Sequence, residues 1–379
     1  MNLIHRHIFA NVVLTCGAAV GMFAFVLMIG NVLSDLLGHM VAGQLAADTV
    51  VHLIGLMIPV VVSYALPMGM LTGILLVLGR MSSDREITAL RASGLSVAWL
   101  SAPVIFCALL GVVLNLAINF QFMPRAKVAY EAELAQAVRQ NPLSFIVPKT
   151  FIRDFPGIVI YAGDKKGTVL RDFWLWELDG QNRVKRFVRA DTGRVDFDEK
   201  KNKLVLTLLH AQAEVRDDKD PENFSEARGA AAMDQATFDL PLGRLTGRGA
   251  IHVKQKWLTF DQLMQEWRRL DRPDPAVPTA DREKLQMRVQ VTIHEKFATA
   301  FSVLSFALVA IPLGIKISRK ETSANFGIGL ALAMAYYFAT IVVSWFDGQI
   351  ALRPDLLMWL PNFGFQALGL WMFYKVDRS

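Results

Sequence analysis

Residues 97–122 read VAWLSAPVIFCALLGVVLNLAINFQF and include no charged side chain. A helix needs roughly 20 predominantly apolar residues to cross about 30 Å of hydrocarbon, so this stretch is long enough to span a membrane. Five comparable apolar runs lie at about 8–33, 51–78, 297–315, 326–345 and 356–374. The sequence therefore predicts a polytopic membrane protein with six transmembrane helices.

The placement of apolar residues along the chain is more informative than their number. Of 379 residues 53% are apolar, against about 45–50% in an average soluble domain. Many Lys and Arg residues lie next to apolar runs, where anionic headgroups account for the formal net charge of +6. No zinc-ligand spacing or nucleic-acid motif is present, so nucleic acid is not a predicted partner. Cys16 and Cys107 both lie in apolar runs, which argues against a disulfide-stapled exterior domain.

A long polar block, about 124–295, separates the first three apolar runs from the last three. Short strand-like segments recur in it at about ten-residue spacing, which is typical of a β-sandwich or an open barrel. They are 157–161, 173–178, 184–188, 194–198, 204–209 and 213–216. Asp179-Gly180, between the second and third segments, is a strong turn signal. The expected fold class is an α-helical membrane protein with an inserted all-β domain.

The end of this block favours helices. An amphipathic helix is predicted over 258–270, a Pro-rich linker over 272–278, and a helix over 281–295 that leads into the fourth apolar run. The predicted domains are 1–123 with the first three spans, 124–280 with the β-domain and its linker, and 281–379 with the last three spans.

Lys and Arg in the short connections predict the orientation, because these residues are enriched on the cytoplasmic side of membranes. They occur before the first run, between the second and third, between the fourth and fifth, and after the sixth. The connection 34–50 has none, and the connection after Trp345 has only Arg353. Both termini are therefore predicted to be cytoplasmic, and the central block is predicted to lie outside.

The connection between the second and third runs contains DREITALRASG at 84–94. Ser83 and Glu86 have capping-box spacing, so a helix is predicted to start there, and Gly94 is a natural stop. Ile87, Leu90 and Arg91 fall on neighbouring positions of one side. Two interpretations are open for this helix. It could lie on lipid headgroups, or it could be a coupling helix that docks into a groove of a cytoplasmic motor.

The sequence predicts no catalytic residue, no metal site and no cofactor in this chain. A GxxxxGK[ST] phosphate loop is missing, so the chain is not expected to hydrolyse ATP by itself. GxSxG, HExxH and paired-cysteine patterns are missing as well. His294 and Glu295 are adjacent, and adjacent side chains on a helix point about 100° apart, which disfavours a shared metal.

The chain resembles the lipopolysaccharide-export permeases of the F/G type, the membrane subunits of an ABC transporter in Gram-negative bacteria. The resemblance covers essentially the whole chain and rests on the order of several motifs. They are Leu66-Pro67, the segment 84–94, His294-Glu295-Lys296-Phe297, the segment 311–315 (IPLGI) and Trp359-Leu360-Pro361-Asn362. Glu86-Ile87-Thr88 and Pro312-Leu313-Gly314 favour the F type over the G type.

The resemblance implies a periplasmic β-jellyroll and a heterodimer of F and G subunits. It also implies two copies of a cytoplasmic ATPase, which would bind ATP and magnesium. The expected substrate, lipopolysaccharide, enters from the outer leaflet of the bacterial inner membrane and passes to a periplasmic bridge protein. A single-span partner with its own jellyroll is usual.

By resemblance, the segment at about 82–94 is the coupling helix that enters the ATPase groove. The residues expected to carry this role are Asp84, Arg85, Glu86, Ile87, Leu90 and Arg91.

One departure from the family concerns substrate phosphates. Family members contact them with basic residues near the exterior end of the first span, but residues 34–39 read SDLLGH here. Arg288 and Lys296 are the alternative candidates for substrate binding, although both also suit a role as interfacial anchors.

Two other classes of function compete with an exporter. A membrane-anchored scaffold or sensor could bind a ligand with its β-domain, and it would need no ATPase partner. A membrane enzyme acting on lipids would need an acid, base or nucleophile clustered at one depth, and the apolar runs offer none. Asn115 and Asn119 are instead predicted to form hydrogen bonds between helices.

Overall fold

The computed structural model describes residues 3–41, 45–140, 146–153, 157–179, 181, 183–198, 203–215, 229–241, 255–271, 279–316, 322–346 and 352–378. The chain divides into two compact units. The membrane unit comprises Met1–Leu33, Gly55–Val128 and Val253–Ser379, and the second unit comprises Ser34–Ile54 and Ala129–His252.

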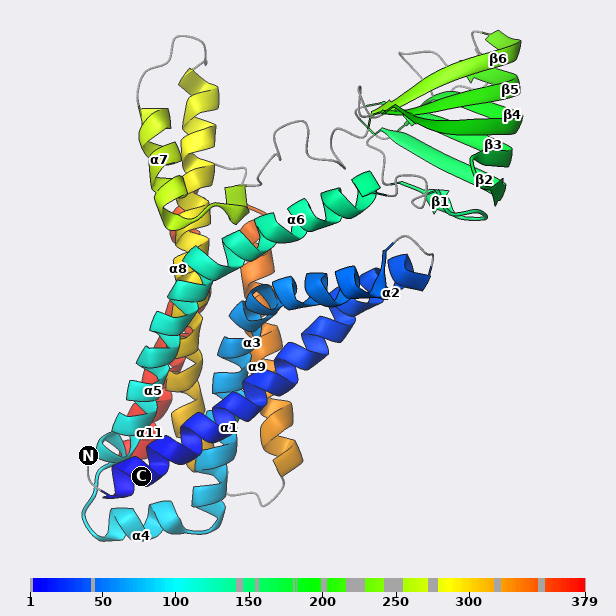
Figure 1. The fold of residues 1–379 in the computed structure, drawn as a ribbon. Helices are drawn as coiled ribbons and strands as arrows, with labels where there is room; N and C mark the ends of the chain where they lie inside the picture. The colour runs from blue at the N-terminus through cyan, green and yellow to red at the C-terminus, as the bar shows by residue number, and fades with distance from the viewer. Residues whose placement is uncertain are drawn as a thin grey trace. The chain divides into compact units, whose positions relative to one another are not determined.

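The described residues contain six helical segments that are long and apolar enough to cross a membrane. This confirms the predicted number of spans. Their helices are α1 (Leu3–Met28), α3 (Ala47–Ser83), α5 (Val97–Ala117), α8 (Thr279–Lys316), α9 (Thr322–Ser344) and α11 (Leu360–Asp377), with the short α10 (Pro354–Leu357) before α11 (Figure 1).

Several helices run further than the apolar runs suggest. A π-helical turn, η2 (Ile118–Phe122), joins α5 to α6 (Met123–Gln140), so the start of the predicted exterior block is helical. Similarly, η1 (Ile29–Leu33) joins α1 to α2 (Ser34–Val41). The predicted helix 281–295 and the fourth span form one helix, α8. Because α6 is amphipathic and polar on average, an apolar run does not reveal it.

Glycines let the membrane helices approach one another at backbone distance. A Cβ atom at Gly69 would lie 2.6 Å from the backbone nitrogen of Val20, and one at Gly73 would lie 2.6 Å from the Cα of Cys16. Real Cβ atoms do not come this close, so α3 can pack on α1 only with glycine at these positions. Gly69 and Gly73, four residues apart on α3, thus serve helix packing.

The β-domain is one antiparallel sheet in which the strands follow chain order. Together with the six apolar segments, it confirms the predicted fold class. The strands are β1 (Phe151–Ile152), β2 (Ile158–Lys166), β3 (Val169–Leu178), β4 (Val184–Asp198), β5 (Lys203–Val215) and β6 (Gly229–Pro241) (Figure 1). The predicted strands 184–188 and 194–198 form a single strand, and 204–209 and 213–215 form another. Arg216 lies outside the described residues.

The predicted turn at Asp179 connects β3 to β4. The Oδ1 atom of Asp179 accepts hydrogen bonds from the backbone N–H groups of Gln181 and Arg183, both at 2.8 Å. These bonds, above all those from Arg183, hold the pKa of the Asp179 carboxyl below its usual range. Gly180 lies outside the described residues.

A crease crosses the sheet. The pairing skips one row of five residues, Gly163, Asp172, Asp191, His210 and Asp234, while the partners on either side of the row stay in register. Asp172 and His210 have positive φ angles of 49° and 51°. Buried side chains normally alternate along a strand, but here Leu170 and Phe173 are both buried although they lie three residues apart. The crease therefore switches which residues face the core.

Candidate functional site

The short helix α4 (Glu86–Ala92) is the part of the membrane unit that the sequence singles out. It lies at the same end of the unit as the N- and C-termini (Figure 1). The predicted capping box is wrong, because α3 continues to Ser83 and the N-cap of α4 is Arg85, which has a φ of 59° and no side-chain cap.

The predicted stop at Gly94 is confirmed. Gly94 has a φ of 90°, and its N–H donates to the Arg91 carbonyl at 2.9 Å. The N–H of Leu95 donates to the Leu90 carbonyl at 3.3 Å. This pair of bonds is a Schellman motif, which satisfies the last carbonyls of a helix.

One side of α4 packs on the membrane unit and the other side is open. Ile87 is only 4% exposed and belongs to the main apolar core, and Leu90 packs partly against that core. Close by, the Ser82 hydroxyl donates to the carbonyl of Ile315 at the end of α8, at 2.7 Å. The exposed side consists of Asp84, Arg85, Glu86, Thr88, Ala89 and Ala92.

These positions divide the six residues predicted for coupling into three exposed ones (Asp84, Arg85 and Glu86), two half-buried ones (Leu90 and Arg91) and the buried Ile87. Ile87 fastens α4 to its own protein, so it is not an apolar contact available to a partner in this structure. Asp84, Arg85 and Glu86 are exposed, and among the described residues Asp84 alone of the three forms an ion pair, with the exposed Arg80 at 3.7 Å. A partner would thus meet charges and small side chains.

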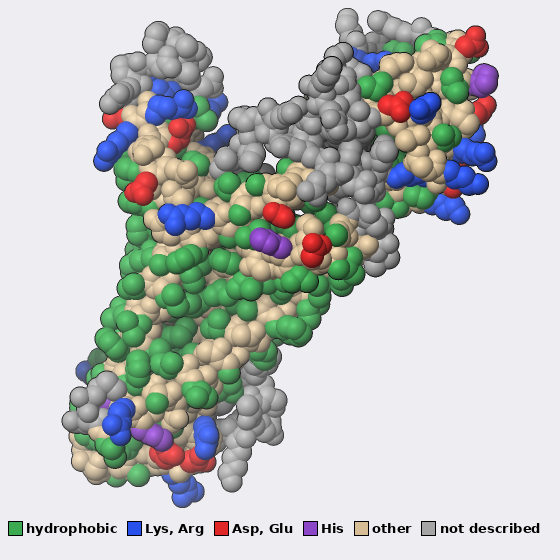
Figure 2. All heavy atoms as spheres, in the orientation of Figure 1, with side chains coloured by type: hydrophobic (Ala, Val, Ile, Leu, Met, Phe, Trp, Pro, Cys, Tyr) green, Lys and Arg blue, Asp and Glu red, His purple; other side chains and the backbone are tan. Residues whose placement is uncertain are grey.

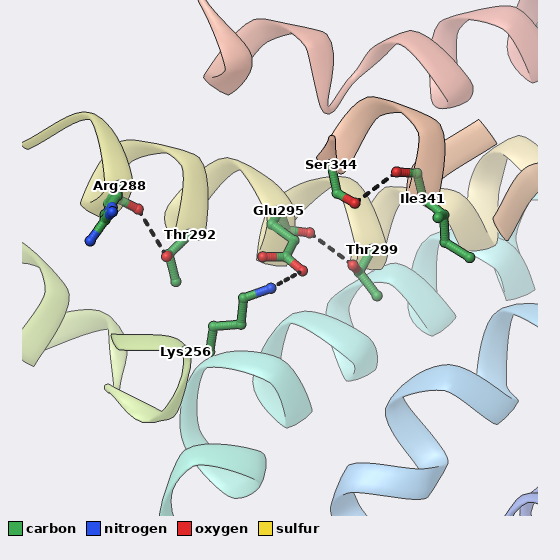
Figure 3. Close-up of polar contacts among 7 residues, drawn as sticks. All are labelled: Lys256, Arg288, Thr292, Glu295, Thr299, Ile341 and Ser344. Atoms are coloured by element: carbon green, nitrogen blue, oxygen red, sulfur yellow. Dashed lines mark hydrogen bonds and ion pairs between the residues drawn. The ribbon is translucent and has the colours of Figure 1, made fainter. Parts of the chain in front are cut away.

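The two candidates for substrate binding lie on α8 in different surroundings. Arg288 is exposed, and among the described residues its guanidinium has no hydrogen-bond or ion-pair partner. Its carbonyl accepts from the Thr292 hydroxyl at 2.9 Å, and Lys256 reaches Glu295 at 3.1 Å (Figure 3). Arg288 therefore remains open to an anion.

Lys296, by contrast, is a closed site. It is 6% exposed, and its Nζ donates to the carbonyls of Asn119 and Leu258 at 3.0 and 2.9 Å. The ammonium also lies 5.6 Å from the centre of the Phe120 ring. These contacts tie α8 to η2 and to the segment before α7 (Phe260–Asp271), the helix predicted over 258–270. Its buried, bonded ammonium is therefore not open to a substrate phosphate in this structure.

His294 joins α8 to the last helices. The indole Nε1 of Trp359 donates to its Nδ1 at 3.0 Å. Nearby, the buried carboxylate of Asp355 accepts two hydrogen bonds from Arg353, at 3.0 and 3.1 Å. Across the described ranges, no three His, Cys, Asp or Glu residues gather to hold a metal ion. The hydrogen bond between His294 and Trp359 thus links two of the motifs quoted from the sequence.

A buried polar network, which the sequence reading missed, joins α8, α9 and α11. Oδ1 of Asn362 accepts from the hydroxyls of Ser305 and Tyr336 at 2.8 and 3.2 Å, and its Nδ2 donates to the Ala298 carbonyl at 2.8 Å. Asn362 stands in the predicted last run, and a polar residue within an apolar run is the signal that could have revealed it.

The predicted role of Asn115 is confirmed, since its Nδ2 donates from α5 to the carbonyl of Thr299 on α8, at 3.2 Å. Asn119 bonds instead within its own helix segment, to the backbone carbonyl and side-chain oxygen of Asn115, at 3.0 and 3.1 Å.

Comparisons with known proteins agree with this arrangement. The family described as "Lipopolysaccharide export system permease LptF/LptG" matches residues 6–375. The chain is 21% identical over 346 residues to the lipopolysaccharide export system permease protein LptF of Escherichia coli (strain K12), covering 88% of this chain and 85% of that protein. The LptF protein of Shigella flexneri matches with the same identity and coverage.

Proposed function

The chain belongs to the family of lipopolysaccharide export permeases LptF/LptG, and we propose that it is a permease subunit of an ABC transporter in the bacterial inner membrane. In this proposal both termini and α4 are cytoplasmic, and the β-domain is periplasmic. The similarity to LptF proteins supports the F type.

The proposed assembly pairs this chain with a paralogous permease subunit and a cytoplasmic ATPase dimer that binds ATP and magnesium. Lipopolysaccharide enters sideways from the outer leaflet of the inner membrane. The β-domain then receives its acyl chains and passes the lipid to a single-span jellyroll partner and a periplasmic bridge protein. The exposed Arg288 is the candidate contact for its phosphates.

The main support for this proposal is that α4 is packed on the membrane helices on one side and exposed on the other. On one side, Ile87 lies in the same apolar core as Ile8 of α1 and Ile311 of α8. On the other side, a charged surface is open to a partner. A force that an ATPase applies to the open side would therefore be passed to the ends of several membrane helices.

The test is to reverse one exposed charge on α4. We expect Glu86→Lys to reduce co-purification with the ATPase at least tenfold, while the chain remains folded. Glu283→Lys is the matched control, because Glu283 is an exposed carboxylate on α8. Undiminished recovery of the ATPase with Glu86→Lys would refute the coupling role. A stable homo-oligomer without any ATPase would instead favour the scaffold or sensor.

A further inference from the structure

A pocket of about 700 Å³ lies between the first turns of α1 and helix α4. This is within the range of ligand-binding pockets, roughly 300–1,000 Å³. Most of the lining is apolar: Leu3, Ile4, Ile8, Ala10, Met81, Ala89 and Leu90. The three polar residues are Arg6, His7 and Glu86. Ile8 and Met81 are buried, so they form the floor.

The pocket lies where the apolar surface of the membrane helices ends. Figure 2 shows hydrophobic side chains along the helices and a gathering of Lys, Arg, His and acidic side chains at the α4 end. Leu3, on the pocket wall, is 75% exposed although it is apolar. Such a mixed boundary is where lipid headgroups meet a membrane protein.

The pocket lining carries two opposite charges, on Arg6 and Glu86. Arg6 and Glu86 are both exposed, and neither forms an ion pair within 4.0 Å with any residue that the structure describes. The third polar residue, His7, lies 3.1 Å from the amide nitrogen of Asn11. A ligand that complements the lining needs an anion for Arg6, a cation for Glu86 and an apolar body. A purely anionic lipid would satisfy Arg6 but would leave Glu86 without a counter-charge.

We propose that this pocket binds a zwitterionic phospholipid of the phosphatidylethanolamine class. Its phosphate lies against Arg6, its ammonium against Glu86, and its acyl chains over Leu3, Ile4 and Ile8. A carboxylate can accept hydrogen bonds from two sides, so Glu86 can contact both the lipid and a protein partner. The lipid fills the space between α4 and α1, and it thereby passes a displacement of α4 on to α1. This proposal rests on the cytoplasmic placement of α4 proposed above.

The space itself is tested by filling it. Ala89 lines the pocket, whereas Ala92 is exposed on the same helix and does not. The full chain is purified without the ATPase, placed in phosphatidylcholine nanodiscs with a tenth of phosphatidylethanolamine, and its retained lipids are counted by native mass spectrometry. We expect Ala89→Trp to lose at least nine-tenths of the retained phosphatidylethanolamine, and Ala92→Trp to keep it. Equal retention by both variants overturns the proposal.

The charges are tested by exchanging the lipid. We expect the unmodified chain to retain phosphatidylethanolamine at least fivefold over phosphatidylglycerol, and Glu86→Gln to abolish that preference. Equal retention of the two lipids by the unmodified chain overturns the zwitterionic assignment. Displacement of the lipid by millimolar glycerophosphoethanolamine, which has no acyl chains, assigns the site to a soluble phosphoethanolamine instead. Because no ATPase is present, these outcomes are independent of the ATPase co-purification test.

Discussion

At the α4 end of the membrane unit, Asp84, Arg85 and Glu86 are exposed, and Arg85 and Glu86 form no ion pair with a described residue. Halfway along α8, the ammonium of Lys296 is buried and bonded to two backbone carbonyls. A buried charge must be fully bonded to be tolerated, whereas an exposed one contributes little to stability. The Lys296 region therefore holds helices in place, and the α4 surface is available for contacts with other molecules.

The largest expected effect comes from the packed side of α4. Ile87→Ala removes a buried side chain from the main core, and such changes cost about 2–5 kcal/mol. We expect a lower thermal unfolding temperature of the purified chain, together with loss of ATPase stimulation by substrate. Thr88→Ala, on the exposed side of the same helix, should leave the unfolding temperature unchanged. If the two variants unfold alike, the assignment of the two sides is wrong.

Lys296→Met should have the next largest effect. Methionine keeps most of the side-chain volume but leaves the carbonyls of Asn119 and Leu258 without their donor. Hydrogen bonds to charged groups contribute about 1.5–3 kcal/mol each, so the two bonds amount to about 3–6 kcal/mol. Methionine is easier to bury than an ammonium and offsets part of this, so we expect a net loss of about 2–4 kcal/mol. Unfolding in denaturant measures it, and Lys284→Met on the exposed surface of α8 is the control. If the denaturant midpoint of unfolding stays unchanged while lipid binding falls, Lys296 is a substrate contact and not a structural residue.

A smaller loss of stability is expected when the uncharged hydrogen-bond network around Asn362 is broken. Asn362→Leu removes the acceptor of the Ser305 and Tyr336 hydroxyls. Hydrogen bonds between membrane helices contribute about 0.6 kcal/mol on average, so we expect a loss of about 1–2 kcal/mol from this residue. The matched control is Asn11→Leu, because Asn11 is exposed on α1 and its amide contacts only His7 of the same helix among the described residues. Equal unfolding temperatures for the two variants would show that the network is dispensable.

The smallest expected change in stability concerns Asp179, whose carboxylate is hydrogen-bonded at the surface of the β-domain. Its pKa is held below the ordinary value, above all by the hydrogen bond from the Arg183 backbone. The stabilisation is therefore complete above the ordinary pKa of about 3.9 and is lost as the pH falls through the lowered value. Tryptophan fluorescence of the full chain between pH 5 and pH 2 should follow this loss. Asp179→Asn should remove that part of the pH dependence, and an unaltered profile would contradict it.

The sequence predicted the membrane spans well because length and apolarity alone decide whether a helix can cross a bilayer. It did not predict α6, whose residues are polar on average, nor the fusion of two short strands into β4. Residues 189–193 read RADTG, which interrupts the alternation that marks a strand. Pairing with neighbours on both sides nevertheless keeps this segment extended.

The candidate site was predictable in place but not in orientation. The capping and stop signals located α4 to within a few residues, although its actual N-cap is Arg85. Which of its sides faces the membrane unit depends on α1 and α8, which lie far away in the sequence. The same holds for Lys296, because its two acceptors belong to segments 177 and 38 residues away.

The crease in the sheet has a consequence for how this gene can change. At the row from Gly163 to Asp234, each strand passes from one inside-outside pattern to the other. Deleting the single codon for Asp172 would restore plain alternation in β3 alone, with Leu170 and Phe173 still on one face, but half of that strand would then be out of register by one residue with its creased neighbours. Neighbouring strands would still be creased, so no single deletion can flatten the sheet. The crease is therefore shared by all five strands of the row, and insertions are better tolerated in the connections between strands.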